Sequence, residues 1–149
     1  MAVDAVFDTR ELEQLAKDLE LIADHYPDEA KTFLQQQANE TRNRMRQMYN
    51  LTTEKKTGNL LKGIRRTQVQ KYQEDYQIRV KNTAPHAHLI EHGHVQWVPV
   101  KGDRKRRRKT EQFVEGRHPA AFTVRSMKAT MGDDASKMVD KVLKKGGLG

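Results

Sequence analysis

The chain has 149 residues, 36% of them apolar and 32% charged, so it is long enough for one domain with a core but has fewer apolar residues than usual. We therefore expect a single domain, residues 1–149, that is completed by partners in an assembly. The absence of cysteine excludes a disulfide framework, a thiolate metal site and a thiol nucleophile, and it fits synthesis in the cytoplasm. No apolar run approaches the length of a signal-sequence core or a membrane span, so we expect a soluble protein without a membrane contact.

The positive charge is concentrated in one short stretch. The net charge is +8, yet the nine residues from Lys101 to Lys109 hold seven positive groups against Asp103, a net of +6 that leaves +2 for the rest. This distribution argues for one basic loop and against a nucleic-acid surface that covers the whole protein.

Two helices are predicted at the start of the chain. The first, residues 8–25, carries an apolar stripe that we expect to face inward: Leu12, Leu15, Leu19 and Ile22. The Tyr26-Pro27-Asp28 turn should end it, because proline disfavours a helical residue before it. A second helix follows over residues 28–49. Three cations stand near its end, Arg42, Arg44 and Arg46, where they complement the helix dipole; we prefer this interpretation to phosphate binding.

The spacing of apolar residues then changes from the period of a helix to the alternation of a β-strand. A flexible polar run over residues 50–56 precedes Thr57-Gly58-Asn59-Leu60, in which Thr57 or Asn59 can cap a single helical turn. Residues 64–82 alternate in polarity, most clearly from Tyr76 to Val80, and predict a β-hairpin with its turn at Gln73-Glu74-Asp75.

A histidine-rich segment, residues 83–94, lies at the centre of the chain. Pro85 suits a first helical position and Gly93 suits a left-handed cap, so two turns of helix are predicted between them. His88 and His92 share one face at i, i+4, with Glu91 beside them.

This spacing raises one enzymatic hypothesis, a small metal-dependent nuclease or hydrolase. Its candidate ligands and bases are His86, His88, Glu91, His92, His94 and His118. Zinc peptidases place the glutamate directly after the first histidine, unlike the order here, and zinc hydrolysis needs a third ligand and an open position. We therefore favour a short amphipathic helix with outward histidines, and expect no enzyme activity, no metal and no cofactor.

The last third of the chain predicts a strand pair and a helix. Val95 to Val100 form a strand that includes the single tryptophan, Trp97, which we expect to be a core or subunit-contact anchor because no second aromatic flanks it for base stacking. The turn at Gly102-Asp103 leads to the basic loop, residues 101–112, which we expect to be solvated and flexible.

The basic loop supports a second hypothesis, a contact with DNA phosphates or with an acidic neighbour. Its candidate contact residues are Lys101, Arg104, Lys105, Arg106, Arg107, Arg108 and Lys109. The alternative is a solvated hairpin tip that protects the sheet edge from aggregation.

Phe113-Val114 should resume a strand that pairs with residues 95–100 and ends at Gly116. Pro119 then opens a final helix, in which Phe122, Met127 and Val142 should supply packing contacts. We expect Gly132-Asp133-Asp134 to interrupt this helix, and residues 145–149 to form a flexible tail after it. The order of elements predicts an α+β domain, with an antiparallel sheet of three to four strands packed by a long N-terminal helix region and a C-terminal helix.

An ordered set of short motifs resembles the tail-component family of long-tailed bacteriophages. The motifs are Thr57-Gly58-Asn59-Leu60-Leu61, Ala84-Pro85-His86-Ala87-His88-Leu89-Ile90-Glu91-His92-Gly93 and His118-Pro119-Ala120-Ala121-Phe122. The resemblance covers about residues 30–145. This chain departs from the usual pattern at His86, His92 and Ala121, where tyrosine, phenylalanine and proline are common.

The resemblance implies a virion protein of the head–tail junction, made in the host cytoplasm. It implies a neck or tail-completion subunit that joins the capsid connector to the tail tube by forming a homo-oligomeric ring, most simply a hexamer, with other neck and tail proteins as partners. In such a ring the basic loops would repeat around the axis, and a separate hypothesis is that they line a channel and contact DNA that passes through it. The motif residues would then be structural: Thr57, Gly58, Asn59, Leu60, Ala84, Pro85, His88, Leu89, Glu91, Gly93, Pro119 and Phe122.

Overall fold

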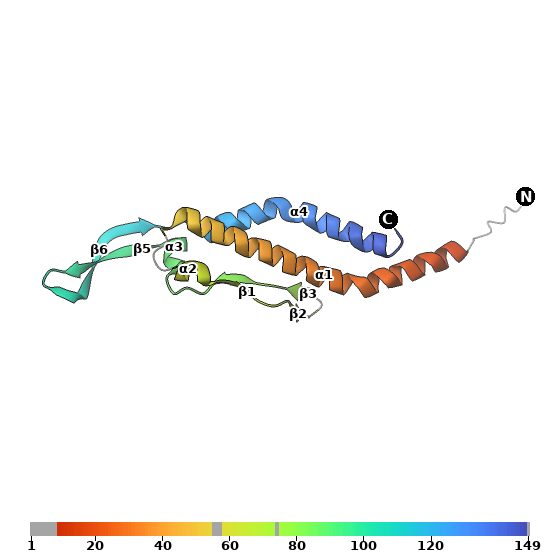
Figure 1. Ribbon diagram of the computed structural model, residues 1–149, viewed down its shortest axis with the longest axis horizontal. Coiled ribbons are helices and arrows are strands. Elements are labelled where there is room, and N and C mark those ends of the chain that lie inside the picture. The colour runs from red at the N-terminus through yellow and green to blue at the C-terminus, as the bar shows by residue number, and fades with distance from the viewer. Residues whose placement is uncertain (1–8, 55–57, 74, 149) are drawn as a thin grey trace, which may run out of the picture.

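One helix of 44 residues, α1 (Thr9–Thr52), is the axis of the fold. The computed structural model describes residues 9–54, 58–73 and 75–148, and α1 runs through the middle of them (Figure 1). The predicted turn at Tyr26-Pro27-Asp28 is wrong, because the helix continues through Pro27. Proline removes one backbone donor, but the packing of the following turns against other elements offsets that local loss.

The final helix, α4 (Pro119–Lys145), lies antiparallel along α1. Contacts in reverse order show the direction: Arg44 donates to Ser126, Gln37 to Asp134 at 3.0 Å, and Lys141 to Glu29 at 2.9 Å. The predicted interruption at Gly132 is wrong, because α4 is continuous there. After Lys145, Gly146, Gly147 and Leu148 close the helix with backbone hydrogen bonds to its last turn.

The strands of the described residues form three antiparallel pairs. The bounds are β1 (Ile64–Arg66), β2 (Gln70–Tyr72), β3 (Asp75–Gln77), β4 (Val80–Asn82), β5 (Gly93–Val100) and β6 (Asp103–Glu115). β1 pairs with β4 and β2 with β3, so the predicted hairpin over residues 64–82 is confirmed, and β5 pairs with β6. The α+β class with antiparallel strands and two long flanking helices is confirmed; the strands are distributed over two-stranded sheets instead of one larger sheet.

Two short helices join these parts. α2 (Asn59–Lys62) is a single turn after Gly58, whose φ is 77°, and Thr57 lies outside the described residues. α3 (Ala87–His92) starts two residues later than predicted, because Pro85 and His86 form a turn before it. The polar run after residue 49 was predicted to be flexible, but α1 continues to Thr52, whose hydroxyl donates to the Met48 carbonyl at 2.7 Å.

The largest departure from prediction concerns the basic segment. Residues 103–112 belong to β6, so the basic segment is one strand of a β-ribbon with β5 and not a loop. The strand from Phe113 pairs with β5 as predicted: Val95 lies opposite Phe113, and His94 lies opposite Val114. A register shift follows between Val95 and Trp97, and further out Pro99 lies opposite Arg107. The pairing overrides the low strand propensity of lysine and arginine. In Figure 1 the ribbon extends beyond the end of the helices.

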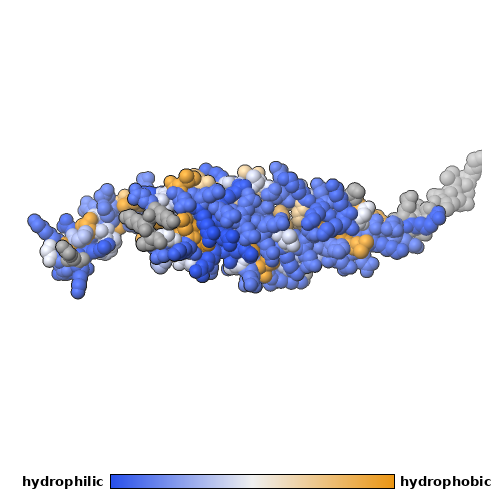
Figure 2. All heavy atoms as spheres, viewed as in Figure 1, coloured by the Kyte–Doolittle hydropathy of each residue, from blue (hydrophilic) through white to orange (hydrophobic). Residues whose placement is uncertain are grey.

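The core is small and lies along α1. Within the part of the chain that the structure describes, Met45, Tyr49 and Ile64 form its centre, and Met127 and Val142 of α4 are also buried. Phe122 was predicted to pack, yet 47% of it is exposed. Hydrophilic side chains cover most of the face in Figure 2, with apolar patches over the N-terminal half of α1 and where the ribbon joins the helices. None of the described helices is long and apolar enough to span a membrane.

Candidate functional site

The motif residues of the central segment meet at the C-terminal half of α1. Leu60 of α2 and Ile90 of α3 both pack against the buried cluster of Met45, Tyr49 and Ile64. Burial raises the pKa of the Tyr49 hydroxyl above its ordinary value of 10. Ala84 accepts the Ala87 backbone N–H at 3.0 Å and so closes the turn before α3. The structure therefore brings three separated segments onto one side of one helix.

Glu91 links this cluster to the start of α4. The backbone N–H groups of Ala120 and Ala121 donate to its two carboxylate oxygens at 2.9 and 3.0 Å. These N–H groups belong to the first turn of α4, where no intrahelical acceptor exists and where the dipole favours a negative charge. His118 precedes the helix and makes no side-chain capping bond. Glu91 thus caps a helix from about thirty residues away in sequence.

Two glycines allow the chain to close around this cap. Gly93 has φ 82° and ψ 174°, a conformation that only glycine adopts readily, and a Cβ there would lie 2.5 Å from the Val114 carbonyl oxygen. A Cβ on Gly116 would lie 2.8 Å from the Gly93 backbone nitrogen. The Arg117 N–H donates to the Ile90 carbonyl at 2.7 Å, which fixes α3 to the segment before α4.

The histidines are not arranged as a metal site. His86, His88, His92 and His118 are exposed, and His94 is half-buried with no partner for Nδ1. Among the described residues, no three histidine, aspartate or glutamate side chains lie close enough together to hold a metal ion. The six residues of the hydrolase hypothesis therefore do not form one site, and Glu91 is occupied as a helix cap.

The β5–β6 ribbon presents two faces that differ in chemistry. Directly opposed residues share a face, so Trp97 with Lys109 and Pro99 with Arg107 form one face, which we call the tryptophan face. Val98 and Arg108 lie on the other. Trp97 is 54% exposed and is therefore not a core residue.

The described cationic side chains of the ribbon have no acidic partners in the described part of the chain. Asp103 accepts the backbone N–H groups of Lys105 and Arg106, at 2.9 and 3.3 Å, and so shapes the turn. Where side chains of the ribbon are described, no lysine or arginine from 101 to 109 forms an ion pair; the Arg104 side chain lies outside the described part. Repulsion among these side chains favours an anionic partner at this end of the molecule.

The opposite end of the molecule carries an exposed apolar stripe and an open groove. Leu15 and Leu19 are 43% and 52% exposed, so the prediction that the stripe faces inward is wrong for these two residues. Ile22 is half-buried beside Gly146, and the Leu12 side chain lies outside the described part. Tyr26, one turn further along α1, is 50% exposed. The stripe leads into a groove of ≈ 500 Å³ between α1, α4 and the end of the hairpin, which we call the α1 groove. Its lining is Tyr26, Ala30, Phe33, Leu34, Asp75, Tyr76 and Met138.

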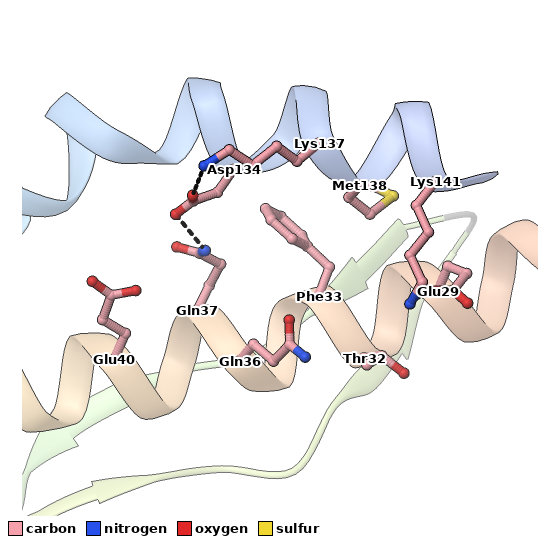
Figure 3. A pocket seen from close by; sticks show the side chains of 10 residues that line it. All are labelled: Glu29, Thr32, Phe33, Gln36, Gln37, Glu40, Asp134, Lys137, Met138 and Lys141. Carbon is pink, nitrogen blue, oxygen red and sulfur yellow. Dashed lines mark hydrogen bonds and ion pairs between the residues drawn. The ribbon is translucent and has the colours of Figure 1, made fainter. Parts of the chain in front are cut away.

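A second, polar pocket of ≈ 330 Å³ lies between α1 and α4 (Figure 3). Gln37 is buried and donates to Asp134, while its Oε1 has no partner. At one end Lys145 and Lys141 bind Glu29 and lower the pKa of its carboxyl from 4.5 to about 2. The acids of this pocket are compensated within the chain, so it serves the contact between the two helices.

These features define an elongated α+β subunit with a small core, charged ends and exposed apolar surface, the kind of protein that is completed by assembly. A model of the family described as "Bacteriophage HK97-gp10, putative tail-component" matches residues 13–93, which is more than half of the chain. The chain therefore belongs to this bacteriophage tail-component family and is a structural protein of the phage tail. No curated protein and no solved structure matches the chain.

The matched region has clear limits in the structure. It runs from the N-terminal half of α1 through the hairpin to Gly93, and so contains the motifs around Gly58 and Glu91. The ribbon from residue 94 onward and α4 lie outside it. Sequence reasoning placed the motifs correctly on short helices but missed what Glu91 binds. One signal was present: α4 begins without a serine, threonine or aspartate before Pro119, so its cap had to come from elsewhere.

Proposed function

We propose that this tail protein is a neck or tail-completion subunit, which forms a ring at the head–tail junction and joins the capsid connector to the tail tube. It acts by assembly and not by catalysis. Its partners are further copies of itself, most simply six in a closed ring, together with neighbouring neck and tail proteins of the virion.

The observation that carries this proposal is the mismatch between the small core and the large exposed apolar side chains at both ends. Trp97 and Phe113 on the ribbon are each more than half exposed, and so is Leu19 on α1. Isolated exposed apolar residues are common on monomers, but aligned sets at opposite ends favour a subunit with two different contact surfaces. Two different surfaces generate head-to-tail contacts, and these close into rings when the rotation between neighbours allows it.

A second candidate function is a contact with DNA through the ribbon, favoured by its unpaired cations next to Trp97. Binding of this kind depends on phosphate charge, so it should weaken steeply with salt and show little sequence preference. Deletion of residues 101–109 should abolish binding to duplex DNA at low salt; unchanged affinity would contradict the DNA contact without affecting the assembly proposal.

The neck proposal predicts a specific defect in phage particles made without this protein. A joining protein acts after heads and tails are complete, so electron microscopy of the lysate should show DNA-filled heads and separate tails of normal length. Expression of the protein in trans should restore joined particles. Absence of tail tubes would assign the chain to tail initiation or tube assembly instead, and joined particles would contradict any requirement for it.

A further inference from the structure

Two surfaces at opposite ends of the subunit have complementary shape and charge. We propose that the tryptophan face of the ribbon in one copy docks on the α1 groove of a second copy and on the acidic row beside it. This inference rests on the proposed ring and names the contact that builds it. The acidic row consists of Glu13, Glu20 and Asp24, which stand at i, i+7 and i+11 and so share one side of α1.

The acidic row continues the side of α1 on which the hairpin of the same chain packs. Lys31, seven residues after Asp24, lies 5.3 Å from the centre of the Tyr76 ring, and Met45 on the same side contacts Ile64. This side of the helix therefore already accepts a two-stranded β element. Lys31 contacts Tyr76 of β3 near the end of the hairpin, whereas Glu13, Glu20 and Asp24 are exposed. In Figure 1 the N-terminal part of α1 extends beyond the hairpin, which leaves room for a second β element in line with the first.

The two surfaces carry net charges of opposite sign. Residues 13–28 hold five acids against Lys17, a net of −4. Glu13, Glu20 and Asp24 have no cation within ion-pair distance in the described parts of the chain. The nearby Lys141 and Lys145 of α4 are occupied by Glu29 and do not neutralise the row. The ribbon, with a net charge of +6, supplies the positive charge that the acidic row lacks within its own chain.

The apolar parts also match. Trp97 and Pro99 are exposed on the tryptophan face, and the groove of ≈ 500 Å³ offers Leu34, Tyr76 and Met138 as lining. A tryptophan buries roughly 150–250 Å² when it is fully covered, and tryptophan and arginine are both enriched among the residues that contribute most to binding at protein interfaces. We therefore assign Trp97 as the anchor and Arg107 and Lys109 as the cations that face the acidic row.

The lengths of the two surfaces agree. Eleven residues of helix from Glu13 to Asp24 span roughly 17 Å. The ribbon from Trp97 to its turn at Gly102 spans about the same distance at roughly 3.3 Å per residue. Because the docking surface and the ribbon are different parts of the molecule, each copy provides both, and the contact repeats from copy to copy.

Charge exchange tests this contact directly. Variant one carries Arg107→Glu and Lys109→Glu, and variant two carries Glu20→Lys and Asp24→Lys. Each variant alone places like charges at every contact. In light scattering, each variant should therefore need a protein concentration roughly thirtyfold or more above that of the wild type to reach the same degree of self-association. An equimolar mixture restores opposite charges at both kinds of contact and should assemble, with the two variants alternating.

Matched controls separate the contact from general charge effects. Arg108→Glu changes the same charge on the opposite face of the ribbon, and Asp133→Lys changes an exposed acid on α4; both should assemble like the wild type. Trp97→Ala should weaken self-association as strongly as the first variant, and added salt should weaken the wild type. Circular dichroism of every variant should match the wild type, because all these side chains are exposed.

Three outcomes would overturn the contact. One is a mixture that fails to assemble, and another is a wild type that remains monomeric at low salt up to its solubility limit. The third is a first variant that loses binding to duplex DNA but self-associates normally, which would assign the ribbon to nucleic acid. Rings that persist in all variants would reject this interface and leave the neck proposal intact. The particle phenotype tests the neck proposal separately, since separate heads and tails do not depend on which residues join the ring.

Discussion

Glu91→Ala should destabilise the protein by about 1.5 kcal/mol. The substitution removes both acceptors for the Ala120 and Ala121 N–H groups at the start of α4. Loss of a helix N-cap costs roughly 0.5–2 kcal/mol, and hydrogen bonds to a charged group stand at the upper end. Ala121 is exposed, so water can satisfy one freed donor and limits the loss. Glu91→Gln keeps one amide oxygen as acceptor and should cost about half as much.

Urea unfolding followed by circular dichroism at low protein concentration measures this difference. The midpoint should fall while the slope stays constant, and the melting temperature should drop by roughly 3–6 °C. The control is Glu111→Ala, an exposed acid on β6, which should stay within about 0.5 kcal/mol of the wild type. If Glu91→Ala is no less stable than the control, the carboxylate does not support α4 and the link between the motifs is refuted.

Two further predictions concern glycines and pH. Gly93→Ala should lower the free energy of unfolding by more than about 2 kcal/mol, because Gly93 has a positive φ and lies close to neighbouring backbone. Gly132→Ala should raise it by about 0.5–1 kcal/mol, because Gly132 lies inside α4 with open space around it. Equal effects of the two substitutions on thermal unfolding would contradict this reasoning. Glu29→Gln should remove the stabilisation that the Glu29 carboxylate gains from its ion pairs with Lys145 and Lys141. Because the folded pKa is about 2 and the ordinary value 4.5, that contribution is present above pH 4.5 and is lost as the pH falls to 2. The stability difference between wild type and Glu29→Gln should therefore shrink over this range, and a constant difference would be evidence against the pair.

The elements that follow local rules could be predicted from the sequence. The hairpin over residues 64–82 has a period of two, and its strands are where the pattern placed them, while Glu74 of the predicted turn lies outside the described residues. Pro119 opens α4 as expected, and Gly93 ends α3 with the positive φ that its position indicated, although its ψ of 174° is extended and not that of a left-handed helix. In these cases the backbone preference of a single residue agrees with its tertiary environment.

The elements decided by distant contacts could not be predicted. Pro27 reads locally as a helix end, yet α1 continues because α4 and the hairpin pack along the helix that follows it. The basic segment has little strand propensity of its own, and it becomes a strand because it pairs with β5, beyond a register shift between Val95 and Trp97.

The candidate site shows the same division. The motif around Glu91 could be placed on a short helix, but its role depends on N–H groups about thirty residues later in the chain. Leu15 and Leu19 have the spacing of a buried helix face. The sequence alone does not reveal that α4 ends opposite Ile22, so that Leu15 and Leu19 remain uncovered. Periodicity identifies an apolar face, while the length of its partner decides whether that face is covered within the chain.

The most direct test of the assembly account is the solution mass of the purified wild-type protein over a concentration series at low salt, with negative-stain images of the same samples. The account predicts closed rings of about six copies that dissociate as salt is added. A mass that stays at one subunit at every concentration, or open filaments that lengthen with concentration, would contradict the claim that the two ends of this chain form a closed ring.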